Sequence, residues 1–488
     1  MQTPVLQQVR SLEHDGGKMS SSAYDTAWAA RVTDQRGKSL FPECVRWLLE
    51  NQHPDGSWGS QILDYHDRVL STLSAIMALN EIDRRQYEPY IQRGETYIWE
   101  HMKYLEVETC QFVGGEMLLP SLIQQAQSMG LDLPLHMKVY EKAHHAKLKK
   151  IEESMWYSPL TSLSFSLEFL GNNVDLACLP NILLSNGSVG NSPAATAFFL
   201  THRKNAKALR YLKTVLQLTG DGSMMEAYPI DVFELGWIMY NLISAGLYLE
   251  WYAEICDLLL SCMGRLGVGM SSGFPVPDLD DTIMGCRALY EMHYPVDFSI
   301  IDAYDVGDYF ATYPFEVGAS VSTNIHVLDF VKNCSEFPNR EEVIERLVRF
   351  IRREIHPGGY WTDKWHVSPY YTTGHAVLAL CNVDLALVET AISWILESQN
   401  ENGTWGEKGG TLEETALAVQ ALMYYHRHIE RIDTEIVSNA ISVLDYGGST
   451  LASAKLPDMW ICKVLYNPVR IVWSAITSAR FMAKTRHL

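Results

Sequence analysis

Three aspartates lie within four residues in the segment 278–281 (DLDD). Like charges raise one another's pKa and burial raises it further, so one of these carboxyls is expected to stay protonated near neutral pH. A carboxylic acid held neutral in a dry, apolar pocket could protonate an alkene, which is a poor base. Two other interpretations are open: a helix N-cap, which suits Asp278, and a magnesium cluster that binds a diphosphate.

The elements that must position this acid are predicted to be helices. Many segments carry apolar residues at helical spacing, and runs of alternating strand pattern are few. Examples are Val69, Leu73, Ile76 and Met77, and then Leu412, Ala416, Val419 and Met423. A chain of 488 residues favours two domains, or one large helical double unit, over a single ordinary core.

A turn signal recurs along the chain, at residues 52–59 (QHPDGSWG) and 399–406 (QNENGTWG), with weaker copies at 219–223 and 356–361. The Asp-Gly and Asn-Gly pairs favour tight turns, and the Gln and Trp side chains could tie one helix end to the next helix. Chance recurrence in a helical protein is the alternative. The repeat predicts stacked helix pairs in two related α/α barrels.

The overall charge argues against nucleic acid as a partner. Asp and Glu outnumber Lys and Arg by 58 to 39, the net charge is −19, and no basic block is present. An anionic substrate would therefore need locally placed Lys or Arg side chains.

Cysteine usage and hydropathy indicate the compartment. The nine cysteines lack paired CxxC spacing, which argues against a disulfide framework or a zinc site. The N-terminal residues 1–12 lack the apolar stretch of a secretory signal, and no apolar run approaches the roughly 18 residues of a spanning helix. We expect a cytoplasmic protein that is not an integral membrane protein.

The sequence resembles the class II diterpene cyclases, a family that includes the copalyl diphosphate synthases. The matching segments are 22–28 (SAYDTAW), 55–59 (DGSWG), 228–234 (YPIDVFE), 278–282 (DLDDT), 363–371 (DKWHVSPYY) and 460–466 (WICKVLY). The resemblance implies an all-α fold of two α/α barrels. Residues 1–18 and 231–488 would form the β domain, and residues 19–230 an inserted γ domain. The class I α domain and its DDxxD motif are missing, so the product should keep its diphosphate.

The resemblance also implies roles around the acidic cluster. Asp280 would be the general acid, and Asp278 and Asp281 would tune and hold it. The family keeps an Asn that bonds this acid, and Asn324 is the matching candidate here. The alternative for Asn324 is a helix cap.

The implied substrate is geranylgeranyl diphosphate, which needs cations around its diphosphate. Lys147 and Lys463 lie where the family binds this group. Lys147 could instead belong to a solvated lysine face. Glu106 and Glu108 match a magnesium-binding stretch, although this chain has fewer acids there than plant relatives.

Aromatic side chains are expected to line the pocket, because ring faces stabilise a carbocation without capturing it. Trp365, Tyr370 and Tyr371 are the candidates, and the alternative for each is an ordinary core position.

One departure from the family concerns how the reaction ends. Plant enzymes that make the unrearranged bicycle hold a water between a His and an Asn, and these positions fall on Phe165 and Glu226 here. Without that base the cation should survive for hydride and methyl shifts. This predicts kolavenyl diphosphate first, with halimadienyl and copalyl diphosphate as alternatives. The base could also lie elsewhere, Glu226 itself included.

Two rival functions remain open at this point. A squalene-type triterpene cyclase also uses DxDD on twin α/α barrels, but such chains are longer and carry more Gln-Trp repeats. A non-catalytic toroid that binds a partner is the second. If the cyclase interpretation holds, a downstream class I terpene synthase or a phosphatase should consume the product.

Overall fold

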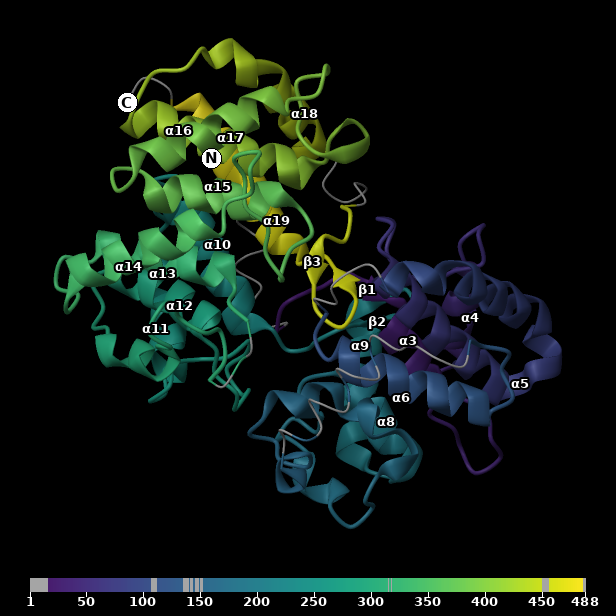
Figure 1. Cartoon of the computed structure of the whole chain (residues 1–488). Helices are drawn as coiled ribbons and strands as arrows, with labels where there is room; N and C mark the ends of the chain where they lie inside the picture. The colour runs from purple at the N-terminus through teal and green to yellow at the C-terminus, as the bar shows by residue number, and fades with distance from the viewer. Residues whose placement is uncertain are drawn as a thin grey trace.

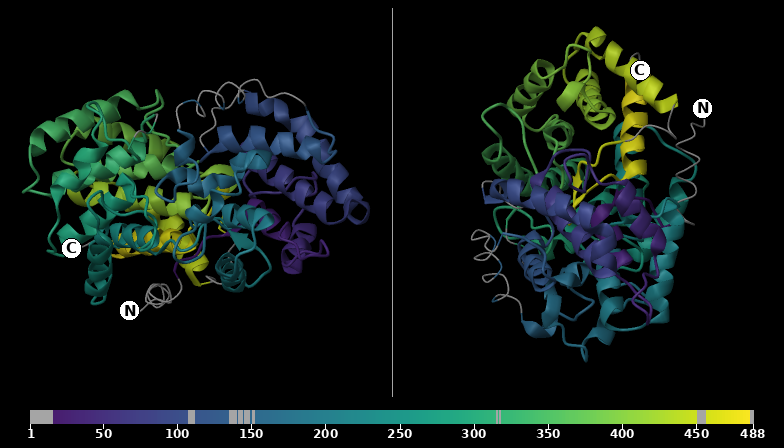
Figure 2. Two further views of the ribbon diagram at one scale, coloured as in Figure 1. Left: turned by 90° about the horizontal axis from the view of Figure 1, so that it is seen from below. Right: turned by 90° about the vertical axis from the view of Figure 1, so that its right-hand side faces the viewer.

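The computed structural model describes residues 16–106, 112–134, 140, 144, 149, 152–314, 316, 318–449 and 456–485. The chain folds into two helical lobes that lie side by side, as Figure 1 and the left view of Figure 2 show. Within the described residues the only strands are four two-residue ones. The all-α prediction is confirmed, and no separate class I domain is evident in the part of the chain that is described.

The lobe that holds the DxDD segment is an α/α barrel. Its inner helices form a closed ring in which each contacts the next and the last returns to the first. In ring order they are α10 (Asp231–Ser244), α12 (Leu279–Glu291), α13 (Val321–Asn333), α15 (Pro369–Leu380), α17 (Leu412–His428) and α19 (Val469–Lys484). Outer helices cover the ring: α11 (Tyr252–Cys262), α14 (Arg340–Arg353), α16 (Leu385–Glu397) and α18 (Ser438–Ser449).

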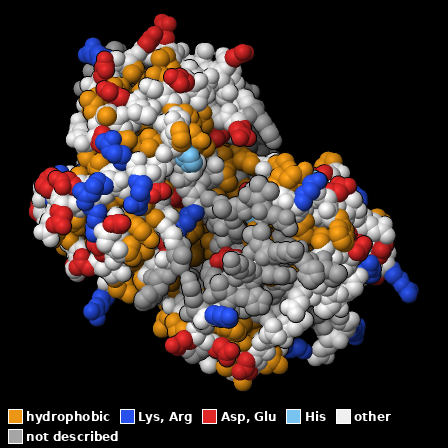
Figure 3. All heavy atoms as spheres, in the orientation of Figure 1, with side chains coloured by type: hydrophobic (Ala, Val, Ile, Leu, Met, Phe, Trp, Pro, Cys, Tyr) orange, Lys and Arg blue, Asp and Glu red, His pale blue; other side chains and the backbone are white. Residues whose placement is uncertain are grey.

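Burial separates the inner from the outer helices. All residues of α15 from Tyr370 to Leu380 are buried, whereas α14 buries only Ile344, Leu347, Phe350 and Ile351. The charged face of α14 contributes to the group of Lys and Arg side chains visible in Figure 3 on that lobe. Several of these arginines are paired with acids, for example Arg346 with Asp305 at 2.8 Å. The charges of α14 are therefore largely balanced locally.

The second lobe is a smaller ring of the same kind. It runs through α3 (Ala23–Ala30), α5 (Tyr65–His101), α6 (Gly115–Ser128), a 3₁₀ segment (Ser162–Asn173) and α8 (Pro193–His202), which returns to α3. Helices α4 (Pro42–Glu50) and α9 (Ala206–Thr219) pack on this ring with one face. Helix α5 is interrupted at Asp83, whose backbone is not helical. The proposed domain boundary at 230/231 falls at the start of α10.

The recurring turn signal has the same structural role in both lobes. The indole N–H groups of Trp58, Trp361 and Trp405 each donate to the carbonyl ten residues earlier, at 2.7–2.8 Å. Gln52 and Gln399 each donate to the turn carbonyl four residues later and to a carbonyl of a following helix or turn. The repeat prediction is therefore confirmed, and the copy at 356–361 shares the Trp bond.

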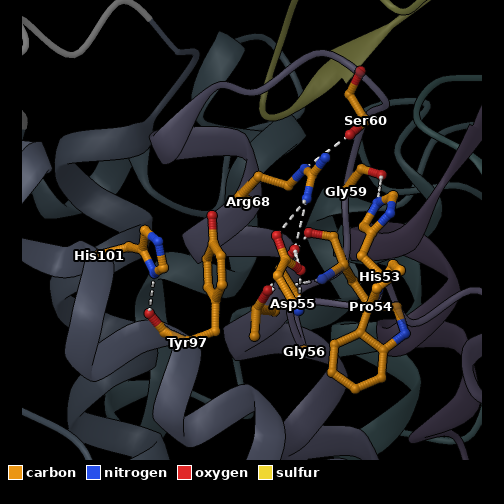
Figure 4. A network of polar contacts seen from close by, with 12 residues as sticks. His53, Pro54, Asp55, Gly56, Gly59, Ser60, Arg68, Tyr97 and His101 are labelled. Carbon is orange, nitrogen blue, oxygen red and sulfur yellow. Dashed lines mark hydrogen bonds and ion pairs between the residues drawn. The ribbon is translucent and has the colours of Figure 1, made fainter.

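A second set of contacts fixes the first of these turns to α5 (Figure 4). Arg68 donates to the carbonyl of Ser60 at 2.8 Å and to the hydroxyl of Ser57 at 2.6 Å, and it forms an ion pair with Asp55 at 3.5 Å. Gly56 has φ +92°, and a side chain there would meet the carbonyl oxygen of Arg93 at 2.6 Å. The turn therefore requires glycine at this position.

A hairpin joins the two lobes. Strand β3 (Trp460–Ile461) pairs antiparallel with β4 (Leu465–Tyr466), and Figure 1 shows β3 between the lobes. Its backbone bonds Trp365 on one side, while Val113 N–H donates to the Cys462 carbonyl and Leu465 N–H to Asp67 on the other. In the second lobe, β1 (Ser21–Ser22) pairs with β2 (Met224–Met225). The hairpin therefore carries side chains into both barrels.

Two further findings bear on the compartment. None of the described helices combines the length and the apolar character that crossing a bilayer requires. The cysteines in the described part of the chain are all free thiols.

Candidate active site

The DxDD segment begins α12. Asp278 is the N-cap residue, and its Oδ1 accepts the backbone N–H of Asp281 at 2.8 Å. Asp280 and Asp281 follow in the first turn, where the helix dipole favours negative charge. The capping interpretation of Asp278 is therefore correct, and it coexists with a buried acidic cluster, because Asp280 is only 8% exposed.

Burial changes the protonation of this cluster. It raises the pKa of Asp278 to about 7. Burial, with the neighbouring charge of Asp278 next, raises the pKa of Asp281 well above its usual range. The cluster therefore retains a proton near neutral pH, as the sequence predicts.

Asp280 is bonded to a histidine on the neighbouring helix α13. Its Oδ1 lies 2.6 Å from Nδ1 of His326, whose side chain is fully buried. The other ring nitrogen of His326, Nε2, lies 2.9 Å from Nδ1 of His375 on α15. Three consecutive helices of the ring thus contribute one continuous chain of polar side chains.

The predicted contact between Asn324 and this acid is wrong. Asn324 Oδ1 accepts the backbone N–H of Phe310 at 2.8 Å, and its Nδ2 donates to the carbonyls of Phe310 and Ser320. Two residues along a helix rotate a side chain by about 200°. Asn324 therefore holds the Phe310 segment to α13, while His326 faces Asp280.

Aromatic rings surround the acid and its histidine. Trp237 Nε1 lies 3.2 Å from the hydroxyl of Tyr371, and the Trp237 ring centroid is 5.6 Å from that of His326. The ring centroid of Trp460, which lies on the hairpin, is 5.0 Å from that of Tyr371. The predicted residue Tyr371 therefore lies beside the histidine that bonds the acid. Such ring faces can stabilise a developing cation.

The other two predicted aromatic residues lie elsewhere. Tyr370 packs against Trp394 of α16 at 4.8 Å and bonds the Ser398 carbonyl, so it faces the outer helices and fits the core alternative. The carbonyl of Trp365 accepts the Ile461 N–H at 2.9 Å. Trp365 thus lies alongside the hairpin, outside the set of rings that contacts His326.

A second histidine network supports the aromatic cluster. The N–H of Ser368 donates to Nδ1 of His366, so the proton of the neutral ring lies on Nε2, which donates to Glu413 at 3.2 Å. Glu413 also accepts the indole N–H of Trp460 at 2.8 Å. The His366 ring is stacked on Tyr371. These bonds fix the orientation of the rings beside the acid.

Lys463 lies at the hairpin tip and is fully buried in the second lobe. Its ammonium donates to Glu168 at 2.8 Å, to the Ser192 hydroxyl at 2.7 Å and to the Phe165 carbonyl at 3.1 Å. Burial alone would lower the pKa of Lys463, but Glu168 and other nearby carboxylates outweigh it and raise this pKa. All three N–H donors are occupied, so this arrangement leaves none for a diphosphate. The predicted role of Lys463 is not supported by this geometry.

The two residues predicted to stand at the family's His and Asn positions both contact Lys463. The ammonium lies 4.7 Å from the centroid of the Phe165 ring. Glu226 Oε1 accepts the backbone N–H of Lys463 at 2.5 Å, while its Oε2 is buried with no hydrogen-bond donor among the described residues. Burial and Asp25 raise the pKa of Glu226 to about 8. The structure therefore brings Phe165 and Glu226 together around one cation.

The remaining predicted residues cannot be placed. Lys147 and Glu108 lie outside the described residues, and Glu106 ends a 3₁₀ turn (Met102–Glu106) whose last side chain is not described. Among the side chains that are described, no group of three or more His, Cys, Asp and Glu could hold a metal ion. The prediction that Glu106 and Glu108 bind magnesium therefore stays untested.

Sequence reasoning missed His326, His375, Trp237 and Trp460. His326 lies two residues beyond Asn324, in the segment already searched for the partner of Asp280. His375 follows Tyr371 by one helical turn, and Trp460 opens one of the segments that carry the family resemblance. The signal in the sequence is helical phase, because residues three or four apart on α13 and on α15 share one face of the helix.

Comparisons with known proteins identify the family. The model of the squalene-hopene cyclase C-terminal domain matches residues 317–423. A type B diterpene cyclase of Mycobacterium tuberculosis is 33% identical over 95% of this chain and 96% of its own length. An ent-copalyl diphosphate synthase of Streptomyces sp. (strain KO-3988) is 31% identical over 97% of this chain and 93% of its own length.

A kolavenyl diphosphate synthase of Vitex agnus-castus is 32% identical over 74% of this chain, which spans 47% of that protein. Among solved structures, an ent-copalyl diphosphate synthase from Streptomyces platensis superposes with a TM-score of 0.79 at 25% identity, covering 99% of this chain and all of that one. The chain therefore belongs to the class II diterpene cyclases, and it is an isomerase of that class.

Proposed function

We propose that this enzyme cyclises geranylgeranyl diphosphate by protonation and leaves the diphosphate in place. The observation that carries the proposal is the bond between Asp280 and His326 beside Trp237, Tyr371 and Trp460. The O–H bond of the Asp280 carboxyl breaks, and the π electrons of the terminal alkene form a new C–H bond with that proton. Asp280 is left as a carboxylate, and the cation is attacked by the next double bond in the chain.

The surroundings suit a cation that must not be captured. The rings beside the acid carry few nucleophilic atoms, and the hydroxyl of Tyr371 lies against the Trp237 indole. Glu413 accepts from His366 and from Trp460 at the same oxygen, Oε1, which holds these side chains in place, while its Oε2 has no hydrogen-bond donor among the described residues. Water exclusion and fixed ring positions then favour cyclisation over hydration.

For the product we propose kolavenyl diphosphate, formed after hydride and methyl shifts. Phe165 and Glu226 stand where the family's water-holding pair is expected, and a relative named kolavenyl diphosphate synthase is among the similar proteins. Halimadienyl diphosphate and unrearranged copalyl diphosphate are the alternatives. The ammonium of Lys463 already lies over the Phe165 ring. We therefore infer that Phe165 acts by keeping a base away from the carbocation, and that its ring does not stabilise the carbocation directly.

Glu226 is the second candidate for the group that ends the reaction. A buried carboxyl with one unpaired oxygen could accept a proton, provided that it is ionised. Its raised pKa opposes ionisation at neutral pH, which favours the rearranged product.

Four further assignments belong to the same proposal. Lys147 would bind the diphosphate, and magnesium held near Glu106 and Glu108 would neutralise its charge, although no step above depends on the metal. A product that keeps its diphosphate needs a class I terpene synthase or a phosphatase to consume it. We propose the cytoplasm as the place of reaction.

The test is to incubate the purified protein with geranylgeranyl diphosphate and magnesium, dephosphorylate the product and identify the alcohol. Kolavenol supports the full proposal, and copalol would sink the rearrangement. A parallel incubation with squalene tests the triterpene alternative. The match to the squalene-hopene cyclase domain is the reason to include it. Turnover of squalene alone would replace the diterpene assignment.

A further inference from the structure

The side chain of His375 is the last member of the chain that starts at Asp280. It is 3% exposed, on the inner helix α15, and its Nδ1 lies 2.9 Å from Nε2 of His326. Nothing in the cyclisation itself needs a second histidine at this place. Because His375 lies next to His326, which bonds the acid, it can affect the charge of His326.

The length of the bond between Asp280 and His326 indicates the charge of His326. At 2.6 Å it is shorter than the 2.9–3.0 Å that is usual for a neutral N–H···O bond, and slightly shorter than the roughly 2.7–2.9 Å of charge-assisted N–H···O bonds. We therefore take His326 as an imidazolium that donates from Nδ1. A positive charge beside the carboxyl favours the carboxylate that forms when the proton leaves.

A buried imidazolium needs an acceptor for each of its two N–H groups, because an unpaired buried donor is costly. Asp280 accepts the first. The atom in reach of the second is Nδ1 of His375, which can accept only if His375 is neutral with its proton on Nε2. Burial, and then the histidines His326 and His366, lower the pKa of His375 well below its usual range. His375 is therefore in the form that accepts.

None of the other described groups around His375 takes its place as the acceptor for the second N–H of His326. Helix α10 contributes the Tyr240 ring at 5.2 Å, and α15 itself contributes Tyr371 at 4.5 Å. His366, from the segment before α15, accepts the Ser368 N–H at Nδ1 and directs its Nε2 proton to Glu413 of α17. Asp280 of α12 acts on His375 only through His326.

We propose that His375 is a positioning residue that holds His326 in its charged form, so that Asp280 acts as a strengthened acid. This inference rests on the proposed cyclisation. It predicts that loss of the acceptor lowers the rate of protonation, leaves substrate binding unaffected, and makes the proton leave His326 at lower pH.

The experiment compares His375→Leu, which removes the acceptor, with His375→Asn, whose amide oxygen can take the place of Nδ1. For His375→Leu we expect kcat to fall by about 10- to 100-fold with KM within about twofold. The alkaline limb of the kcat profile should shift to lower pH by about one unit. His375→Asn should restore most of kcat, and His428→Leu, a histidine at the end of α17, should match the wild type in all respects.

A readout without substrate separates this inference from the proposed function. In protein labelled with ¹⁵N-histidine, the wild type should show one buried histidine as an imidazolium at pH 7, and His326→Asn should remove that signal. In His375→Leu the same residue should titrate at lower pH. If folded His375→Leu keeps the wild-type kcat, pH profile and histidine spectrum, His375 is only a core residue. If the wild type turns over no prenyl diphosphate but the spectra behave as described, the proposed function fails while the charge-holding role stands.

Discussion

Oδ1 of Asp280 accepts a hydrogen bond from Nδ1 of His326 at 2.6 Å, between helices α12 and α13 of the same barrel. The bond depends on helical phase, because Asn324 lies on the same helix and faces a different way. Substitutions at these two positions of α13 should therefore have different effects, one on catalysis and the other on stability.

His326→Ala should lower kcat by about 10²-fold or more, because the acid loses its hydrogen-bond donor. Asn324→Ala should leave kcat of the folded enzyme within a fewfold but lower the free energy of unfolding by about 1–3 kcal/mol, because the polar backbone of Phe310 loses its partner. Steady-state kinetics and urea unfolding on both variants measure this. The reverse pattern, with Asn324→Ala inactive and stable, would restore the family-based role of Asn324.

Lys463→Met should destabilise the protein by about 3–5 kcal/mol, because Glu168 is left as a buried charge without its cation. In the double variant Lys463→Met/Glu168→Gln much of that loss should be recovered, since the unpaired charge is also removed. Denaturant unfolding of the single and double variants measures the coupling. If Lys463→Met keeps its stability and raises only KM for the diphosphate, then Lys463 binds substrate after all.

The pH dependence of stability should reflect Glu226. Its pKa is raised from 4.5 to about 8 on folding, so the folded protein binds a proton there that the unfolded chain releases. Its contribution therefore makes the free energy of unfolding fall as pH rises between these values, by up to about 1.4 kcal/mol per pH unit. In Glu226→Gln the fall measured from pH 5 to 8 should be shallower than in the wild type. The exposed control Glu254→Gln should keep the wild-type slope, and equal slopes in all three proteins would mean that Glu226 is ionised throughout.

Phe165→His should shift the product towards unrearranged copalyl diphosphate, because it restores a group that can act as a base or hold a water. The measurement is the ratio of alcohols after dephosphorylation, with Phe165→Leu as the matched control that removes the ring without adding a base. The double variant Phe165→His/Glu226→Asn should shift the ratio further. An unchanged ratio in both histidine variants would place the product-determining group elsewhere.

The fold and part of the site follow from local signals in the sequence. The Gln and Trp of the repeated turns form the bonds expected of them, and the Asp278 cap follows from its place before a helical pattern. Residue spacing alone did not predict which side chain of α13 meets Asp280, because that depends on how α12 and α13 pack. The sequence also could not predict the burial of Lys463, because its partners Glu168 and Ser192 are 295 and 271 residues away along the chain.

The most direct test of the account is the conversion of geranylgeranyl diphosphate by wild type and by Asp280→Asn, followed by identification of the dephosphorylated product. The wild type should yield a bicyclic diterpene alcohol, which shows that the diphosphate was kept until the phosphatase acted. Asp280→Asn, with an unchanged circular dichroism spectrum, should lose about 10²- to 10⁴-fold or more of this activity. Surface variant Asp302→Asn serves as the control and should be as active as the wild type. A folded Asp280→Asn that still forms the bicyclic product at the wild-type rate would contradict the assignment of Asp280 as the acid.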